Sequence, residues 1–204
     1  EQIDQLEAHA EDVNYDVAEA REKQVRHDVM SHVYAYGQQC PAAEGIIHLG
    51  ATSCYVGDNT DILILRDAMN LTLRKCAQVL RNLSAFADQY KGLPCLAYTH
   101  LQPAQLTTVG KRATLWMNEL VMDMENLEFQ VNQLRLRGTK GTTGTQASFM
   151  ELFEGDEEKV KELEALVARQ MGFEKCVAVS GQTYSRKTDA YVLAALSGVA
   201  QSAC

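Results

Sequence analysis

The sequence predicts an all-α fold, arranged as an elongated bundle of long helices, and three observations lead to this prediction. Only three of the 204 residues are proline and 7% are aromatic, whereas residues that favour helices, such as Ala, Leu, Glu and Gln, are abundant. Apolar residues recur every three or four positions over stretches longer than about 25 residues, and helices of that length indicate bundled packing. Because 46% of the chain is hydrophobic, it can bury a substantial core as one or two domains.

The first half of the chain is expected to form one charged helical region and one long helix. The pattern from 2 to 39 is charged and periodic, with an apolar stripe at every fourth residue. The residues of that stripe are Val25, Val29 and Val33. Small residues dominate 41–57, and the periodic pattern then resumes as a long helix from 58 to 90. Asp58 or Asn59 is the predicted N-cap of this helix, because a short polar side chain accepts the first free backbone N–H groups.

The second half is expected to add three more helices joined by loops. A segment at 98–105, Tyr-Thr-His-Leu-Gln-Pro-Ala-Gln, connects the first long helix to a second one over 107–137. A loop of Gly and Thr follows at 138–148, and an acidic helix then occupies 156–171. The last helix starts near Ser185, after an extended or looped stretch.

The composition argues against several function classes. The net charge of −8 disfavours a general nucleic-acid binder, which would need a basic face. The six cysteines are irregularly spaced without a CxxC pair, so they predict reduced cytosolic thiols rather than a zinc or redox centre. The longest apolar stretch, 191–200, is about half the length needed to span a bilayer, and no signal peptide is visible. We therefore expect a cytoplasmic protein without a membrane segment.

His100 is the candidate for chemistry that the residues alone favour most. A loop on a rigid helical scaffold is where catalytic groups concentrate, and the ordinary pKa of His lies near neutrality. Thr99 can orient the imidazole ring, and Pro103 stiffens the backbone just after it. The alternative is a capping or core histidine in a helix connection, and the residues of this segment alone leave both interpretations open.

Three further polar segments are candidate ligand contacts, each with a structural alternative. Arg26, His27 and Asp28 are consecutive ionisable residues within the first helical region, where charged triplets commonly face solvent. The run at 48–53 places small residues before a helix, where backbone N–H groups can approach an anion or simply be capped. Gln182 lies among polar residues just before the last helix, and N-capping of that helix is the alternative explanation.

The chain has no sequence motif for a metal or a cofactor. Gly138, Gly141 and Gly144 recur at every third position, but they fit neither the Walker pattern nor the dinucleotide fingerprint. The HExxH zinc motif and the G-x-S-x-G nucleophile elbow are also missing. The sequence therefore predicts no metal and no cofactor, and the glycine loop indicates either a flexible connection or a backbone nest for an anion.

Taken together and in this order, the polar segments resemble the adenylosuccinate lyase family of the fumarase and aspartase superfamily. The resemblance runs through essentially the whole chain, which amounts to less than half of a family chain. We therefore expect an excerpt that lacks the N-terminal start, the catalytic-serine loop and the C-terminal domain. The motifs that carry the resemblance are Arg26-His27-Asp28, the run from His48 to Ser53 continuing through Asp58-Asn59-Thr60-Asp61, Thr99-His100, Lys140 to Thr145, and Ser180 to Thr183.

The resemblance implies a β-elimination that releases fumarate from adenylosuccinate to give AMP, and also from the succinyl-carboxamide intermediate of purine synthesis. Such an elimination needs a base that removes a proton beside a carboxylate and an acid that protonates the departing nitrogen. By resemblance, His100 is the acid. The family's base is a serine in a loop of pattern S-S-x-x-M-P-x-K-x-N, and none of the seven methionines here precedes a proline. This stretch alone is therefore expected to be inactive.

The resemblance also implies which residues contact the small anionic substrate, a succinyl purine nucleotide. Those matching substrate-binding positions are Arg26, His27, Asp28, Thr52, Ser53, Thr99 and Gln182. Among them, Arg26 is the natural phosphate partner, and His27 supports the acid electrostatically. His48 matches a histidine near the site whose role stays open.

At the level of domains, residues 1–52 are expected to end an N-terminal helical domain, and residues 53–204 to begin a central long-helix bundle. The family assembles as a homotetramer with a helical core, in which each site is shared between three subunits. Two alternatives to this function remain at the level of sequence. One is a sister lyase of the superfamily, such as argininosuccinate lyase or fumarase, and the other is a helical oligomerisation scaffold without catalysis.

Overall fold

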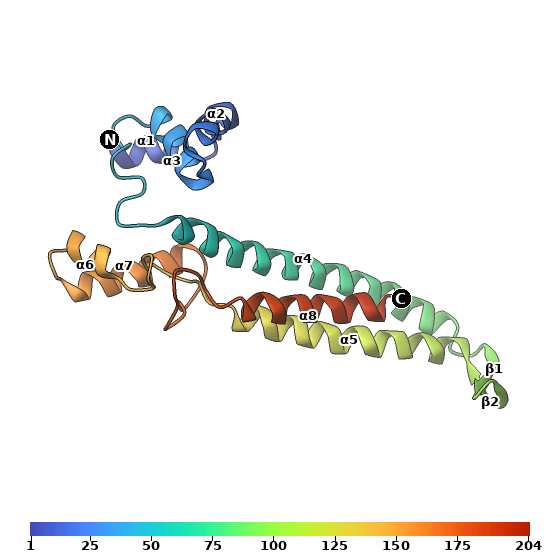
Figure 1. Cartoon of the computed structure of the whole chain (residues 1–204). Coiled ribbons are helices and arrows are strands. Elements are labelled where there is room, and N and C mark those ends of the chain that lie inside the picture. Colours follow the sequence, from blue (N-terminus) through green and yellow to red (C-terminus); the bar gives the residue numbers. More distant parts are fainter. The chain divides into compact units, whose positions relative to one another are not determined.

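The computed structural model describes all residues from Glu1 to Cys204, and it confirms the predominantly helical bundle fold (Figure 1). In chain order, its elements are α1 (Gln2–Ala8), α2 (Tyr15–Val25), α3 (Asp28–Gln39), α4 (Ser53–Gln89), β1 (Pro94–Thr99), β2 (Gln102–Thr108), α5 (Val109–Gln133), α6 (Ala147–Leu152), α7 (Glu157–Gln170) and α8 (Lys187–Ser202).

The chain forms two compact units. Unit 1 comprises Glu1–Ile62 together with Arg135–Tyr184, and unit 2 comprises Leu63–Leu134 together with Ser185–Cys204. Helix α4 contributes its N-terminal part to unit 1 and the remainder to unit 2. The expected division of the whole protein into domains at Ser53 stays a prediction.

The N-terminal part of unit 1 is the helical region expected over 2–39, and the structure divides it into three short helices. Each break has a local cause in a capping side chain. Asn14 accepts the backbone N–H of Val17 at the start of α2, and His27 accepts that of Met30 at the start of α3. These helices are tied together by the Tyr36 hydroxyl, which donates to the Leu6 carbonyl over 2.5 Å.

The rest of unit 1 is built from α6, α7 and the loops around them. Helix α7 agrees with the predicted helix over 156–171, and Asp156 caps it by accepting the N–H of Lys159. The turn before α4 packs on α6: Gly50 has a φ of +70°, and a Cβ there would lie 2.5 Å from Leu152 Cδ1. This contact fixes the position of the 48–53 run within unit 1.

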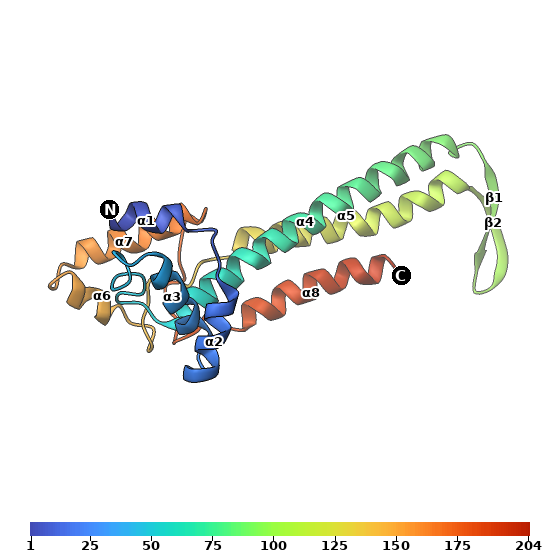
Figure 2. The ribbon, with the colours of Figure 1, turned by 90° about the horizontal axis from the view of Figure 1, so that it is seen from above.

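Unit 2 is a bundle formed by the larger part of α4, by α5 and by α8. Helix α5 agrees closely with the predicted helix over 107–137. It packs along α8, and both views show α4, α5 and α8 running lengthwise together (Figures 1 and 2). Buried residues of α5 recur every seventh position at Ala113, Leu120 and Leu127. Gly110 permits the start of α5 to approach the end of α4 closely, because a Cβ there would lie 2.3 Å from the Ala87 carbonyl oxygen.

The predicted N-cap of the long helix is wrong. Helix α4 begins at Ser53, and both Asp58 and Asn59 lie inside it, where they are only 4% and 1% exposed. Their side chains bind backbone groups from distant parts of unit 1 instead of the N–H groups of their own helix. Asp58 and Asn59 therefore make hydrogen bonds to residues far away in the sequence, and they do not cap α4.

One β-hairpin interrupts the helices, and the expectation of a simple helix connection around His100 was wrong. Strands β1 and β2 pair antiparallel, with Thr99 opposite Gln102 and an irregular register between Leu96 and Tyr98. The hairpin is joined to the bundle by the backbone N–H of Val109, which donates to the Leu93 carbonyl over 3.0 Å. His100 is thereby placed at the tip of a two-stranded ribbon.

Two further findings concern the chain as a whole. All six cysteines are free thiols. None of the helices is both long enough and apolar enough to cross a membrane.

Candidate functional site

The Arg26-His27-Asp28 segment forms the break between α2 and α3, rather than lying within a helix as predicted. Arg26 has a left-handed backbone with a φ of 52° and ends α2 by donating its N–H to the Glu22 carbonyl. His27 is extended and starts α3. Because the chain changes direction here, the three side chains project from the corner between α2 and α3. They are not distributed around the axis of one continuous helix.

The imidazole of His27 has two alternative roles at this corner. The Met30 N–H donates to its Nδ1 over 3.3 Å, so in the neutral ring the proton resides on Nε2. Asp28 Oδ1 lies 3.6 Å from the same Nδ1, where it would pair only with a protonated ring. Nδ1 of His27 therefore lies between the first free N–H groups of α3 and a carboxylate oxygen.

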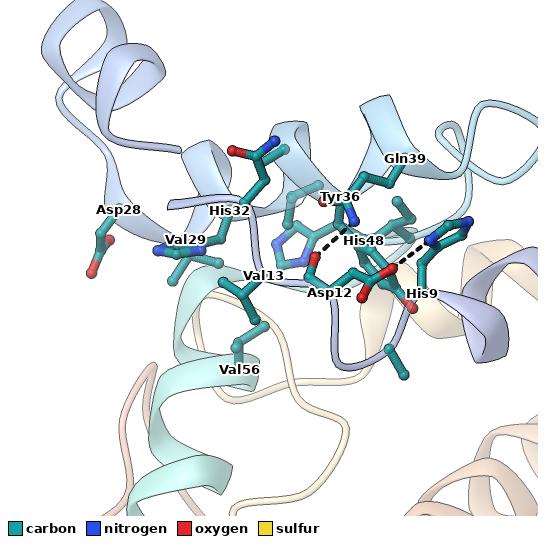
Figure 3. Close-up of a pocket in the computed structure, with 15 residues that line it drawn as sticks. His9, Asp12, Val13, Asp28, Val29, His32, Tyr36, Gln39, His48 and Val56 are labelled. Carbon is teal, nitrogen blue, oxygen red and sulfur yellow. Dashed lines mark hydrogen bonds and ion pairs between the residues drawn. The ribbon is translucent and has the colours of Figure 1, made fainter. Parts of the chain in front are cut away.

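A pocket of about 450 Å³ lies beside this corner, within unit 1, and it brings Asp28 and His48 into one cavity. Its walls come from the α1–α2 connection, from α3 and from the segment before α4 (Figure 3). The paired side chains of His9 and Asp12, with Nδ1 and Oδ2 2.9 Å apart, lie on the opposite side from Asp28 (Figure 3). Burial, with a smaller contribution from nearby His27, lowers the pKa of His48 and favours its neutral form.

Thr52 and Ser53 lie where the 48–53 run enters α4. Ser53 is the first residue of the helix. The Thr52 hydroxyl oxygen is buried and has no hydrogen-bond partner. Unpaired buried polar atoms are uncommon in proteins and call for a functional explanation. The Thr52 hydroxyl is therefore available to bind a polar group of a ligand.

The buried polar residues of α4 organise the Gly and Thr loop. Asn59 binds both backbone groups of Gly138: its Oδ1 accepts the N–H over 3.0 Å, and its Nδ2 donates to the carbonyl over 3.3 Å. Lys140, itself 5% exposed, pairs with Glu164 Oε1 over 2.6 Å. Burial, with the charge of Glu164 as a lesser cause, raises the pKa of adjacent Cys176 to about 11, so that thiol remains protonated.

Gln182 lies in a second loop that packs against the first one. The two loops approach so closely that a Cβ on Gly144 would lie 1.8 Å from the Ser180 carbonyl oxygen. Asp58 Oδ2 fixes the end of this second loop by accepting the Tyr184 N–H over 2.6 Å. The Gln182 side chain is exposed at the surface of this arrangement.

Thr99 and His100 belong to unit 2, at the tip of the hairpin. His100 and Leu101 are the two turn residues, and both have left-handed backbones, with φ values of 50° and 63°. A two-residue turn with both φ values positive is the type I′ hairpin turn, which favours Asn and Gly. The imidazole is therefore presented on an exposed and strained turn.

The structure brings most of the predicted site residues into one unit, but not the predicted acid. Those in unit 1 are Arg26, His27, Asp28, His48, Thr52, Ser53 and Gln182, and those in unit 2 are Thr99 and His100. Sequence reasoning assigned no role to Arg137 and only a capping role to Asp58 or Asn59, whereas all three hold the loops of unit 1 together. The signal for Asp58 and Asn59 was their place in the recognised motif, whereas Arg137 gave no signal beyond being charged. No group of three or more His, Cys, Asp and Glu side chains is arranged to hold a metal ion.

Comparisons with known proteins place this chain among lyases. A family model described as lyase matches residues 3–202. The chain is 53% identical to the adenylosuccinate lyases of Saccharomyces cerevisiae and Schizosaccharomyces pombe, over 100% of its own length and 42% of theirs. It is 48% identical to the adenylosuccinate lyase of Schistosoma mansoni, over 98% of this chain and 42% of that protein. It therefore spans about two fifths of the length of these relatives.

Solved structures support the same fold. A fumarate lyase from Mesorhizobium sp. BNC1 superposes with a TM-score of 0.77 at 22% identity, covering 93% of this chain and 43% of that one. A 3-carboxy-cis,cis-muconate lactonizing enzyme from Pseudomonas putida gives a TM-score of 0.75 at 23% identity, with 93% and 42% covered. At such identities the likeness concerns the fold alone.

Proposed function

This chain belongs to the lyase family, and on that premise we propose that the full-length protein cleaves adenylosuccinate to AMP and fumarate by β-elimination. The same chemistry would release fumarate from the succinyl-carboxamide intermediate of purine synthesis. The observation that carries the proposal is the 53% identity to two adenylosuccinate lyases over the whole of this chain. Every motif recognised in the sequence lies within that matched length.

The proposed elimination moves two protons. A base takes the proton from the carbon beside a succinyl carboxylate, and the electron pair left there forms the double bond of fumarate as the carbon–nitrogen bond breaks. An acid then gives a proton to the departing nitrogen, so that it leaves as the amine of AMP. His100 is the proposed acid. The proposed base is a serine in a part of the full-length protein outside these residues.

The geometry of the hairpin tip supports the role of His100. A non-glycine residue in the left-handed region costs about 1–3 kcal/mol, and such strain concentrates at functional sites. Here two successive non-glycine residues adopt it, His100 and Leu101, and Leu101 is 94% exposed. The two-residue hairpin requires this backbone, but His and Leu stand where Asn and Gly are favoured, and the turn presents the imidazole at an exposed tip, as a proton donor to a substrate requires.

The residues of unit 1 are proposed to hold the substrate. Arg26 offers a guanidinium at the α2–α3 corner for the phosphate, and Asp28 lies in the same segment. Thr52 and Ser53 are proposed to bind the succinyl carboxylate together with Thr99, as negative charge develops there. Further proposed contacts are those of Gln182 and His27, with His48 as a neighbour of the site.

Assembly of copies is proposed to complete the site, as a homotetramer whose sites are shared between three subunits. Inside unit 2, the α4 segment from Leu63 to Gln89 extends over about 40 Å at 1.5 Å per residue, and the hairpin lies beyond its C-terminal end. The predicted acid is thus at one end of its own unit. A second copy of the chain is the proposed source of the surfaces that surround it.

The exposed faces of unit 2 support this assembly. Large apolar side chains recur at seven-residue spacing on the surface of α5, at Leu115, Met122 and Phe129, which are 51%, 61% and 58% exposed. A similar exposed stripe follows α4 at Ile64, Leu71, Val79 and Phe86. Repeats of this kind form the seams between helices of a bundle, and apolar patches of this extent mark association surfaces.

The test of the proposed function is a substrate panel on the purified full-length protein. We expect release of fumarate from adenylosuccinate, without added metal or cofactor, in a reaction that we place in the cytoplasm. Release of fumarate only from argininosuccinate or malate would replace the proposal with a sister lyase. Absence of turnover on every compound, together with an unchanged melting temperature in the presence of AMP, would favour a helical scaffold without catalysis.

A further inference from the structure

Arg137 is the one fully buried arginine at the meeting point of the two loops of unit 1. Its side chain is 0% exposed. Nη1 donates to the Lys140 carbonyl over 2.6 Å, and Nη2 donates to the Gly141 carbonyl over 2.7 Å. Nη2 also lies 3.5 Å from the Gly181 carbonyl in the second loop. One guanidinium therefore spans both segments.

The interaction is specific to arginine. Burial lowers the pKa of Arg137, and the charges of Asp58 and Cys54 act in the opposite direction. A guanidinium nevertheless remains charged in proteins, and its planar fork directs several N–H donors at fixed angles. Burying a charge carries a penalty of several kcal/mol, so a buried cation bound to carbonyls needs a structural purpose. Two of the three carbonyls belong to the 138–145 loop and the third belongs to the 180–184 loop, so the guanidinium links the two loops.

The loop that contains Gln182 is held at both ends. On one side, the Gly181 carbonyl faces Arg137, and on the other, the Tyr184 N–H donates to Asp58. The Ser180 carbonyl packs against Gly144 of the first loop. Between these fixed points, the Gln182 side chain is exposed and free to contact a ligand.

We infer that Arg137 is a positioning residue, whose guanidinium sets the distance between the 138–145 loop and the 180–184 loop and so places Gln182 for substrate binding. Arg137 itself is buried and touches no substrate. The inference rests on the proposed function only in so far as Gln182 contacts the substrate. The bracing of the two loops is independent of that function and can be measured without it.

The experiment uses the full-length protein with Arg137→Lys and Arg137→Ala, and Arg169→Lys as a matched control. Lysine keeps the charge but has one ammonium group, which cannot reach both loops in a fork. Arg169 is an exposed arginine on α7 in the same unit. Hydrogen exchange of the 180–184 amides is measured alongside the melting temperature, and then KM and kcat for adenylosuccinate.

For Arg137→Lys we expect amide exchange at 180–184 to accelerate about tenfold, as a local opening, while exchange in α5 stays at the wild-type rate. We expect KM to rise about tenfold, because the misplaced Gln182 would lose about one hydrogen bond to the substrate. We expect kcat to stay close to the wild-type value. Millimolar guanidinium should restore KM of Arg137→Ala, where sodium chloride does not. If Arg137→Ala does not fold, the lysine variant alone carries the test.

The inference is overturned if Arg137→Lys matches wild type in exchange at 180–184, or if exchange accelerates uniformly across unit 1 without a local maximum. A wild-type protein without activity on adenylosuccinate would remove the proposed function but leave the exchange measurement decisive for the bracing role. The control Arg169→Lys is expected to match wild type in every measurement.

Discussion

The loops of unit 1 and the hairpin tip of unit 2 carry candidate site residues in opposite physical settings. In unit 1, Asn59, Arg137 and Lys140 are buried, and each binds backbone or charged groups at 2.6 to 3.3 Å. At the hairpin tip, Leu101 is 94% exposed and His100 has a strained backbone. The loops of unit 1 are held by hydrogen bonds within the same chain, whereas the hairpin tip is exposed to solvent.

This difference indicates how the proposed site is divided. A region that must bind a substrate repeatedly in one geometry needs rigid support, which unit 1 supplies internally through buried hydrogen bonds. A histidine on a two-stranded ribbon has little such support, because an isolated hairpin is only marginally stable in water. Contacts with another copy would then supply both the order of the tip and the rest of the site. Four predictions test this comparison.

The largest effect is expected for His100→Ala in the full-length protein. Removing a general acid typically lowers turnover by about 10²–10⁴-fold, and the melting temperature should not change, because the tip is exposed. Fumarate release is the measurement. His9→Ala, which removes a half-exposed imidazole from unit 1, is the control and should keep wild-type turnover. Near-normal turnover of His100→Ala would remove the assigned acid.

The next effect concerns assembly. Met122→Glu places a carboxylate in the exposed apolar stripe of α5, where burial against another copy would leave the charge unpaired. We expect a smaller molar mass by light scattering and a loss of turnover. Thr114→Glu introduces the same charge on an exposed position of the same helix, about 100° around the helix axis from Leu115 and so outside that stripe, and it should remain a tetramer. A tetrameric Met122→Glu protein would argue against α5 as the seam.

Three glycines separate crowding from backbone strain in unit 1. Gly144→Ala combines a φ of +79° with a contact of 1.8 Å, so we expect a loss of about 3 kcal/mol in the free energy of unfolding. Gly155→Ala has a φ of +85° but open space, and should lose only about 1 kcal/mol. Gly181→Ala has neither feature and should match wild type. Urea denaturation measures all three, and equal losses would show that the two loops are not in close contact.

The smallest effect is a pH dependence from His48. Its pKa is lowered below the ordinary value of 6.5, mainly by burial, so the unfolded chain binds more protons than the folded one below about pH 6.5. The stability contributed by neutral His48 is therefore present above pH 6.5 and is lost as the pH falls toward its folded pKa. His48→Gln should show a shallower loss of stability between pH 7 and 5 in thermal melts. An unchanged slope would mean that His48 is solvated in the folded protein.

Much of the helical architecture could be predicted, because periodic apolar residues report packing directly. The long helices matched within a few residues, since the stripes that define them are the buried faces of α4 and α5. The hairpin was missed, because Pro103 lies in β2 and prolines argue against a strand unless it is an edge. The N-cap at Asp58 was missed because its partner, the Tyr184 N–H, lies far away in the sequence.

Only part of the candidate site could be predicted, again because some of its residues act through partners that are distant in the sequence. His27 stood out as part of a charged triplet within a predicted helical region, and His100 stood out in a predicted connection between helices. The structure instead places His27 at the break between α2 and α3, and His100 in a hairpin turn. Arg137 could not be predicted, because a buried arginine and an exposed one have the same local pattern. Its role depends on three carbonyls that only the tertiary structure brings together.

The central claim is that His100 from one copy completes a site formed by unit 1 of another, and mixing two inactive variants tests it most directly. Full-length His100→Ala and His27→Ala are purified separately, dissociated together and allowed to reassociate. If sites are shared, some sites of the mixed tetramers receive an intact His100 and an intact His27, so fumarate release from adenylosuccinate should reappear. A mixture that is no more active than its separate components would contradict the shared site.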